Sequence, residues 1–131
     1  MDVKASGLRT QQAEATKDRV AEAARSVFAE RGYAAATISA ISAASGVPEQ
    51  TIYSAFGSKA QVLARVTQLW MRDTRTRERA EAYLREGDPA RRLRQFAVLN
   101  RVQLDAGADV LEIYREAARN DASWLPPSTR C

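Results

Sequence analysis

The sequence contains no histidine and only one cysteine, Cys131, which is its last residue. Without histidine, the chain lacks the commonest general base at neutral pH and the commonest ligand of catalytic zinc. One cysteine can form neither an intrachain disulfide nor a cysteine zinc cluster. The sequence also has no glycine-rich phosphate loop and no nucleophile beside a base. We therefore predict that the protein is not an enzyme and uses no cofactor and no metal.

Long hydrophobic runs are also missing from the sequence. No apolar stretch approaches the roughly 20 residues that are needed to cross a bilayer. The charged N-terminus, MDVKASGLRTQQAEATKDR, lacks the apolar segment of a signal peptide. We therefore expect a cytoplasmic protein without a membrane partner. The 20 basic and 16 acidic residues give a net charge of +4, which is compatible with a polyanionic partner but does not identify one.

Most of the chain repeats its apolar residues with the period of an α-helix. One face of the segment 16–31 carries Val20, Ala24, Val27 and Phe28. Gly32 follows, and glycine commonly ends a helix because it adopts the left-handed conformation easily. A longer helix is expected from residue 59 to about 84, and two more after Asp88-Pro89 and after Gly107. No segment alternates as a β-strand would, so we predict an all-α fold.

Two short helices are expected around a tight turn between residues 37 and 57. Thr37 stands at an N-cap position, where its hydroxyl can accept from the free amides of the next turn. Gly46 permits the bend, and the second short helix begins near Glu49 after Pro48. This order is that of a helix-turn-helix. Its apolar residues are expected to bury together: Ile38, Ile41, Val47, Ile52 and Phe56 with Val20, Val27 and Phe28.

The second short helix has an outer polar face that suits the major groove of DNA. Its outward side chains are Gln50, Thr51, Tyr53 and Ser54. Glutamine and threonine can hydrogen-bond to base edges or phosphates, and a tyrosine hydroxyl can reach a phosphate oxygen. Lys59 opens the next helix, where its charge and the free N–H groups would together attract phosphate. Glu49 is unfavourable beside phosphate unless it accepts from a cytosine amino group or points to solvent.

The stretch from Arg19 to Leu63 resembles the DNA-binding domain of the TetR family of bacterial transcriptional regulators. Several short segments carry the resemblance in the family's order and spacing: Phe28 to Tyr33, Thr37, Gly46-Val47, Thr51-Ile52-Tyr53 and Phe56-Gly57-Ser58-Lys59. The resemblance implies that Thr37, Tyr53 and Lys59 hold the DNA backbone. It also implies that Glu49, Gln50 and Thr51 touch bases or nearby phosphates. The chain departs from many members at Ala55, which cannot make a phosphate contact.

Residues 1–15 are polar and show no sustained apolar period, so we expect a flexible N-terminal arm there. The resemblance implies a three-helix DNA-binding domain over residues 16–63. Residues 64–131 would form a partial helical effector and dimerisation domain, with the helix after Ser58 bridging the two domains. Family members normally continue with further helices, whereas this sequence turns into the irregular tail PPSTRC. The expected second domain is therefore a truncated one.

Two functions remain open from the sequence. The favoured one is a ligand-responsive repressor that binds a palindromic operator in double-stranded DNA as a homodimer. The alternative is a truncated interaction module that pairs with a related regulator and modulates its DNA binding. Aromatic residues could line a pocket for a small-molecule effector, although helical spacing favours core packing for them: Trp70, Tyr83, Tyr114 and Trp124.

Overall fold

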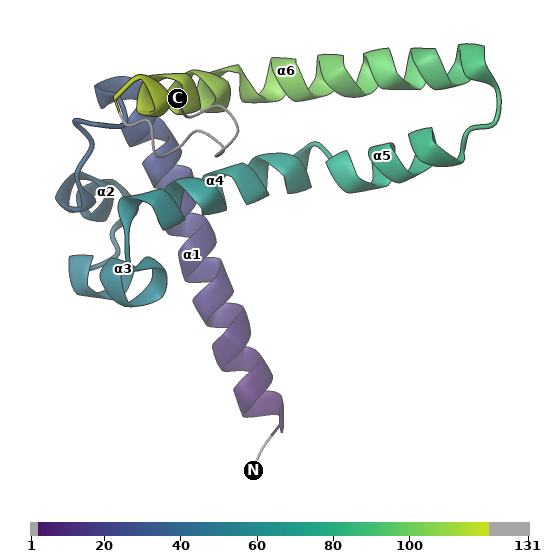
Figure 1. Cartoon of the computed structure of the whole chain (residues 1–131). Helices are drawn as coiled ribbons and strands as arrows, with labels where there is room; N and C mark the ends of the chain where they lie inside the picture. The colour runs from purple at the N-terminus through teal and green to yellow at the C-terminus, as the bar shows by residue number, and fades with distance from the viewer. Residues whose placement is uncertain (1–2, 121–131) are drawn as a thin grey trace, which may run out of the picture.

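The computed structural model describes residues 3–120, and these residues form helices and turns without any strand (Figure 1). The helices are α1 (Val3–Arg31), α2 (Ile38–Ser45), α3 (Glu49–Phe56), α4 (Lys59–Asp73), α5 (Thr76–Arg85) and α6 (Pro89–Asn120). The predicted all-α fold is confirmed. The tail that the sequence predicts to be irregular begins after residue 120, outside the described residues.

The helix α1 is the centre of the core, with α2 and α4 as its main neighbours. Of the eight residues that the sequence places in this core, seven are buried: Val20, Val27, Phe28, Ile38, Ile41, Val47 and Ile52. Phe56 is only partly buried and packs against the edge of the cluster. Full burial of a large aliphatic or aromatic side chain is worth about 1.5–3 kcal/mol, so these residues fix α2 and α3 against α1.

The helix α1 begins at Val3, so the arm expected over residues 1–15 is helical over most of its length. The side chains of residues 6–15 are exposed, and Leu8 is 58% exposed. Because residues 6–15 bury no side chain, this segment shows no apolar period. Its alanine, glutamine and arginine residues favour the helix, which extends from the packed part of α1. Figure 1 shows the N-terminal half of α1 projecting beyond the other helices.

The sequence pattern predicts one helix to about residue 84, but the structure divides it at Thr74. The Thr74 hydroxyl donates to the carbonyl of Trp70 over 2.9 Å and accepts from Gln103 of α6 over 2.8 Å. Arg75 then adopts the left-handed conformation, with φ of 53°. No glycine or proline marks this break, and the Thr74 side chain contacts α6 there.

The helices α5 and α6 form a hairpin that leaves the domain, and the second half of α6 returns over α1 and α4 (Figure 1). Asp88 caps α6 by accepting from the Arg91 amide over 3.0 Å, as its position before Pro89 predicts. Gly107, expected to separate two helices, has a non-helical conformation with φ of −127° and ψ of 19°, so α6 consists of two helical stretches that meet there at a kink. The ring of Trp70 occupies the space where a Cβ on Gly107 would lie.

Two ion-pair clusters fasten the outer helices to α1. Arg25 of α1 pairs with Asp109 of α6 over 2.6 Å. Asp18 of α1 pairs with Arg65 over 2.7 Å and with Arg72 over 3.1 Å, both on α4. The hydrogen bonds from Arg25 lower the pKa of Asp109. Burial alone would raise the pKa of Asp18, but the two guanidinium groups outweigh it, so this pKa is also lowered.

We expect acid to destabilise the fold through these two carboxylates. A folded-state pKa below the ordinary value of 3.8 gives stability that is present above that value. The stability is lost as the pH falls through the lowered pKa of the folded state. Because the groups are partly exposed, each pair should contribute about 0.2–1 kcal/mol. Urea unfolding between neutral pH and pH 3 should therefore show a smaller loss for Asp18→Asn/Asp109→Asn than for the wild type, and equal losses would contradict this.

Candidate nucleic-acid interface

The helices α2 and α3 and the turn between them form the expected helix-turn-helix. Thr37 caps α2, because its hydroxyl accepts from the Ala40 amide over 3.0 Å. Gly46 ends α2 in the left-handed conformation, with φ of 73°. The Ser42 hydroxyl donates to the Val47 carbonyl over 2.6 Å and closes the turn. These contacts hold the turn between the two helices, and the shared core holds both helices against α1.

The helix α3 buries one side and exposes the other. Ile52 is 1% exposed and anchors the helix to the core, while Phe56 is partly buried. The residues of α3 that are predicted to contact DNA are all exposed: Glu49, Gln50, Thr51, Tyr53 and Ser54. Tyr53 is 54% exposed. Figure 1 shows α3 at the edge of the molecule, away from the α5–α6 hairpin.

The exposed face of α3 is polar but carries no positive charge of its own. Its sequence, EQTIYSAF, contains the carboxylate of Glu49 and no lysine or arginine. Glu49 lies in the first turn, where a negative side chain stabilises the positive end of the helix dipole. Apart from Glu49, the polar side chains of α3 are neutral, and neutral hydrogen-bonding groups suit base edges and single phosphate oxygens.

Lys59, expected to hold phosphate, has its ammonium group in the turn between α1 and α2. The Nζ atom donates to the carbonyls of Tyr33 over 2.6 Å, Ala36 over 3.2 Å and Ala34 over 3.4 Å. It also lies 4.4 Å from the centroid of the Tyr33 ring. Burial lowers the pKa of Lys59, and the charge of Glu116 acts in the opposite direction. The side chain thus supports the turn that leads to Thr37.

Glu116 of α6 is a contributor to this region that the sequence reasoning did not identify. Its carboxylate accepts from the Tyr33 amide over 2.6 Å. A Cβ on Gly32, where φ is 82°, would lie 2.7 Å from the same carboxylate. The side chains of Lys59 and Glu116 therefore hold the α1–α2 turn from two helices. No local pattern reveals this contact, because 83 residues separate Tyr33 from Glu116.

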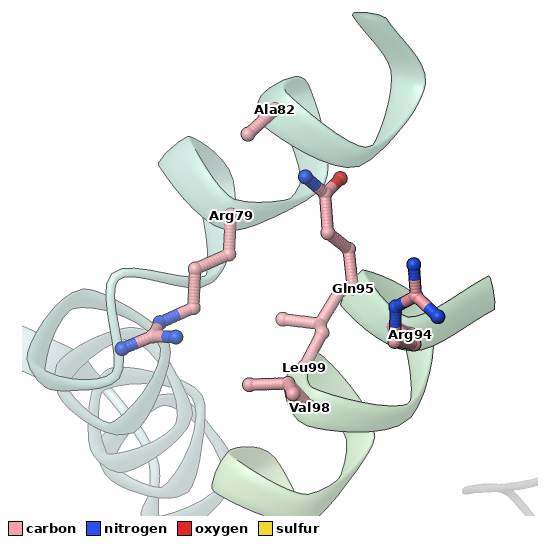
Figure 2. Close-up of a pocket in the computed structure, with 6 residues that line it drawn as sticks. All are labelled: Arg79, Ala82, Arg94, Gln95, Val98 and Leu99. Atoms are coloured by element: carbon pink, nitrogen blue, oxygen red, sulfur yellow. The ribbon is translucent and has the colours of Figure 1, made fainter. Parts of the chain in front are cut away.

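A cavity of about 300 Å³ lies between α5 and α6 (Figure 2). Its lining consists of Arg79, Ala82, Arg94, Gln95, Val98 and Leu99. The Oε1 atom of Gln95 is buried and has no hydrogen-bond partner among the described residues.

The aromatic residues that we considered for a pocket do not line this cavity. Trp70 packs on Gly107, and Tyr83 packs on Phe96 with ring centroids 5.7 Å apart. Tyr114 hydrogen-bonds to Thr67 over 2.6 Å. The fourth, Trp124, lies outside the described residues.

Among the described residues, no helix combines the length and the hydropathy of a membrane-spanning segment. Residues 3–120 also contain no group of three or more histidine, cysteine, aspartate or glutamate side chains that could hold a metal ion.

Part of the chain matches a known protein family. The model of the bacterial regulatory proteins of the tetR family matches residues 20–66. The matched region contains the packed half of α1, all of α2 and α3, and the first half of α4. No curated protein and no solved structure matches the chain. The chain therefore carries the helix-turn-helix DNA-binding domain of the tetR family of bacterial regulatory proteins and is a DNA-binding transcriptional regulator.

Proposed function

We propose that this regulator is a repressor that binds a palindromic operator as a homodimer and responds to a small ligand. The observation that carries the DNA-binding part is the two-sided helix α3, which is anchored by Ile52 and exposes its polar side chains. One helix-turn-helix offers few contacts, and two copies related by a twofold axis would match the two halves of a palindrome. The chain would act in the cytoplasm, where the DNA of a bacterium lies.

In this proposal, some exposed residues of α3 contact bases and others contact phosphates. Gln50 can form paired hydrogen bonds with adenine, and Thr51 can contact a base edge or the thymine methyl group. Tyr53 and Ser54 present hydroxyls that can donate to phosphate oxygens, which would fix the register of the helix on the duplex. Thr37 joins them at the start of α2, where free backbone amides also attract an anion. Glu49 can accept from a cytosine amino group.

The cavity between α5 and α6 supports the proposal of a small effector. Its apolar walls come from Ala82, Val98 and Leu99, and the buried Gln95 oxygen would accept a hydrogen bond from a ligand. Arg79 and Arg94 belong to its lining, and guanidinium groups favour a ligand with negative charge. Through the contact of Glu116 with the α1–α2 turn, a movement of α6 on ligand binding would reach the DNA-binding helices.

The alternative function, an interaction module that pairs with a related regulator, rests on the exposed apolar residues of the hairpin. Leu84 is 72% exposed and Leu93 is 69% exposed, which is unusual for a surface that remains uncovered. The two functions differ in their need for α3. A regulator loses DNA affinity when the exposed side chains of α3 are removed, whereas an interaction module is indifferent to the change.

We expect Gln50→Ala combined with Tyr53→Phe to weaken binding to the chain's own upstream DNA by about tenfold to a thousandfold. The first change removes base contacts worth about 1–3 kcal/mol, and the second removes one phosphate hydrogen bond worth about 0.5–1.5 kcal/mol. Fluorescence anisotropy at fixed salt measures the affinity. Tyr83→Phe on α5 is the matched control, because it makes the same chemical change outside the DNA-binding domain. Equal affinity of all three proteins would refute the proposed function.

A further inference from the structure

The α1–α2 turn, residues 32–36, satisfies only part of its own backbone hydrogen bonding. Within the turn, the Ala36 amide donates to the Gly32 carbonyl over 3.1 Å. The Tyr33 amide donates outside the turn, to the carboxylate of Glu116 on α6 over 2.6 Å. A backbone amide left without a partner inside a protein is unfavourable, so the first half of the turn depends on α6 for this hydrogen bond.

The carboxylate of Glu116 also fits closely against the residue that opens the turn. Gly32 has φ of 82°, and a Cβ there would lie 2.7 Å from the Oε1 atom of Glu116. Any other residue at this position would be strained and would push the carboxylate away from the Tyr33 amide. A hydrogen bond to an ionised group is roughly twice as strong as one between neutral groups. The contact between Glu116 and the turn is therefore both close and strong.

Glu116 supports the same turn a second time, through the charge of Lys59. The Lys59 ammonium donates to the carbonyls of Tyr33, Ala34 and Ala36. Burial lowers the pKa of Lys59, and the negative charge of Glu116 opposes this shift. Glu116 thus favours the protonated lysine that holds the carbonyls of the turn, while its own oxygen holds the amide.

The turn ends at the residue that begins the DNA-binding helices. Thr37 follows Ala36 directly, and its hydroxyl accepts from the Ala40 amide over 3.0 Å to cap α2. The helix α2 has only 8 residues, so a displacement of its first turn displaces most of the helix. The position of Thr37 therefore depends on the position of the α1–α2 turn.

We infer that Glu116 is a positioning residue for DNA binding, because its carboxylate fixes the turn that sets where Thr37 and the start of α2 meet the DNA backbone. This inference rests on the phosphate contact proposed above for Thr37. The negative charge of Glu116 would be unfavourable beside phosphate, so the residue acts through the turn and not by touching DNA. Hydrogen bonds to phosphate need donor–acceptor distances of about 2.7–3.2 Å, so a small shift of the turn loses the contact.

Glu116→Ala is expected to weaken binding to the chain's own upstream DNA on the order of tenfold, because the turn loses its hydrogen bond from α6. Glu116→Gln should keep most of the affinity, since its amide oxygen can still accept from the Tyr33 amide. Fluorescence anisotropy at fixed salt measures the affinity, and circular dichroism checks that each variant is folded. Glu116→Asp is the second variant if Glu116→Ala does not fold, and its shorter side chain should also weaken binding.

The matched control is Glu112→Ala, one turn earlier on α6. Glu112 pairs with Arg115 and Arg119 of the same helix, over 3.4 Å in each case. Glu112→Ala and Glu116→Ala both remove one negative charge, which by long-range electrostatics strengthens DNA binding. A loss of affinity in Glu116→Ala alone is therefore opposite to the effect of charge. Equal affinities of Glu116→Ala and Glu112→Ala would overturn the inference.

A double-variant cycle with Thr37→Asp separates positioning from a general structural role. Aspartate keeps the cap of α2 but repels phosphate, so the contact that Glu116 positions is already lost. Adding Glu116→Ala to Thr37→Asp should then weaken binding by less than about twofold, because coupled residues are not additive. A full second loss would show that Glu116 does not act through Thr37.

The α3 variants distinguish failure of this inference from failure of the proposed function. If Gln50→Ala/Tyr53→Phe weakens binding and Glu116→Ala does not, only the positioning role of Glu116 is refuted. If the α3 variant binds the upstream DNA as tightly as the wild type, the proposed function itself is refuted.

Discussion

Phe28→Ala is expected to lower the free energy of unfolding by about 3–5 kcal/mol. The side chain is 1% exposed and lies near the C-terminal end of α1, with its ring centroid 5.2 Å from that of Tyr33. Its removal leaves a cavity beneath the turn that leads to α2. Close-packed neighbours relax only partly into such a cavity, so lost contacts add to the lost hydrophobic transfer energy.

Urea unfolding followed by circular dichroism measures this change. The control is Leu8→Ala in the same helix, where the side chain is 58% exposed and the expected change is within about 0.5 kcal/mol. Since small domains are stable by only about 5–15 kcal/mol, Phe28→Ala should also reduce the fraction of protein that can bind DNA. Equal unfolding energies for the two variants would show that Phe28 does not support the core as described.

Lys59→Met is expected to lower the free energy of unfolding by about 1.5–3 kcal/mol. The ammonium group donates to three backbone carbonyls in the turn between α1 and α2. Methionine keeps much of the aliphatic chain but leaves those carbonyls without this donor. Lys59→Arg should restore stability only in part, because a planar guanidinium group directs its donors differently from an ammonium group.

Two measurements separate this structural role from the phosphate contact that the family resemblance implies. A structural lysine changes the unfolding energy, and it weakens DNA binding without altering the dependence of affinity on salt. A phosphate contact leaves the unfolding energy unchanged and reduces the salt slope by about one. Unfolding in urea together with a salt titration of DNA affinity therefore decides which role Lys59 has. An unchanged unfolding energy would contradict the structural role.

Short-range signals in the sequence determined the DNA-binding unit. Thr37 and Ser58 occupy N-caps, and the Ser58 hydroxyl accepts from the Gln61 amide over 3.2 Å. Gly46 ends α2 in the left-handed conformation that its position predicts. Apolar spacing identified the buried residues of α1 to α3, because each helix presents one face to a common core. These features depend on neighbours within about four residues, which a single sequence displays directly.

The tertiary structure alone decided the features that join distant segments. At the break, Thr74 hydrogen-bonds to Gln103 of α6, and the ring of Trp70 packs on Gly107. The ammonium of Lys59 turned inward because the turn after α1 presents three carbonyls to it. Glu116 reached the same turn from the far end of the described chain. Such contacts leave no local period, since each arises only after helices far apart in the sequence have packed together.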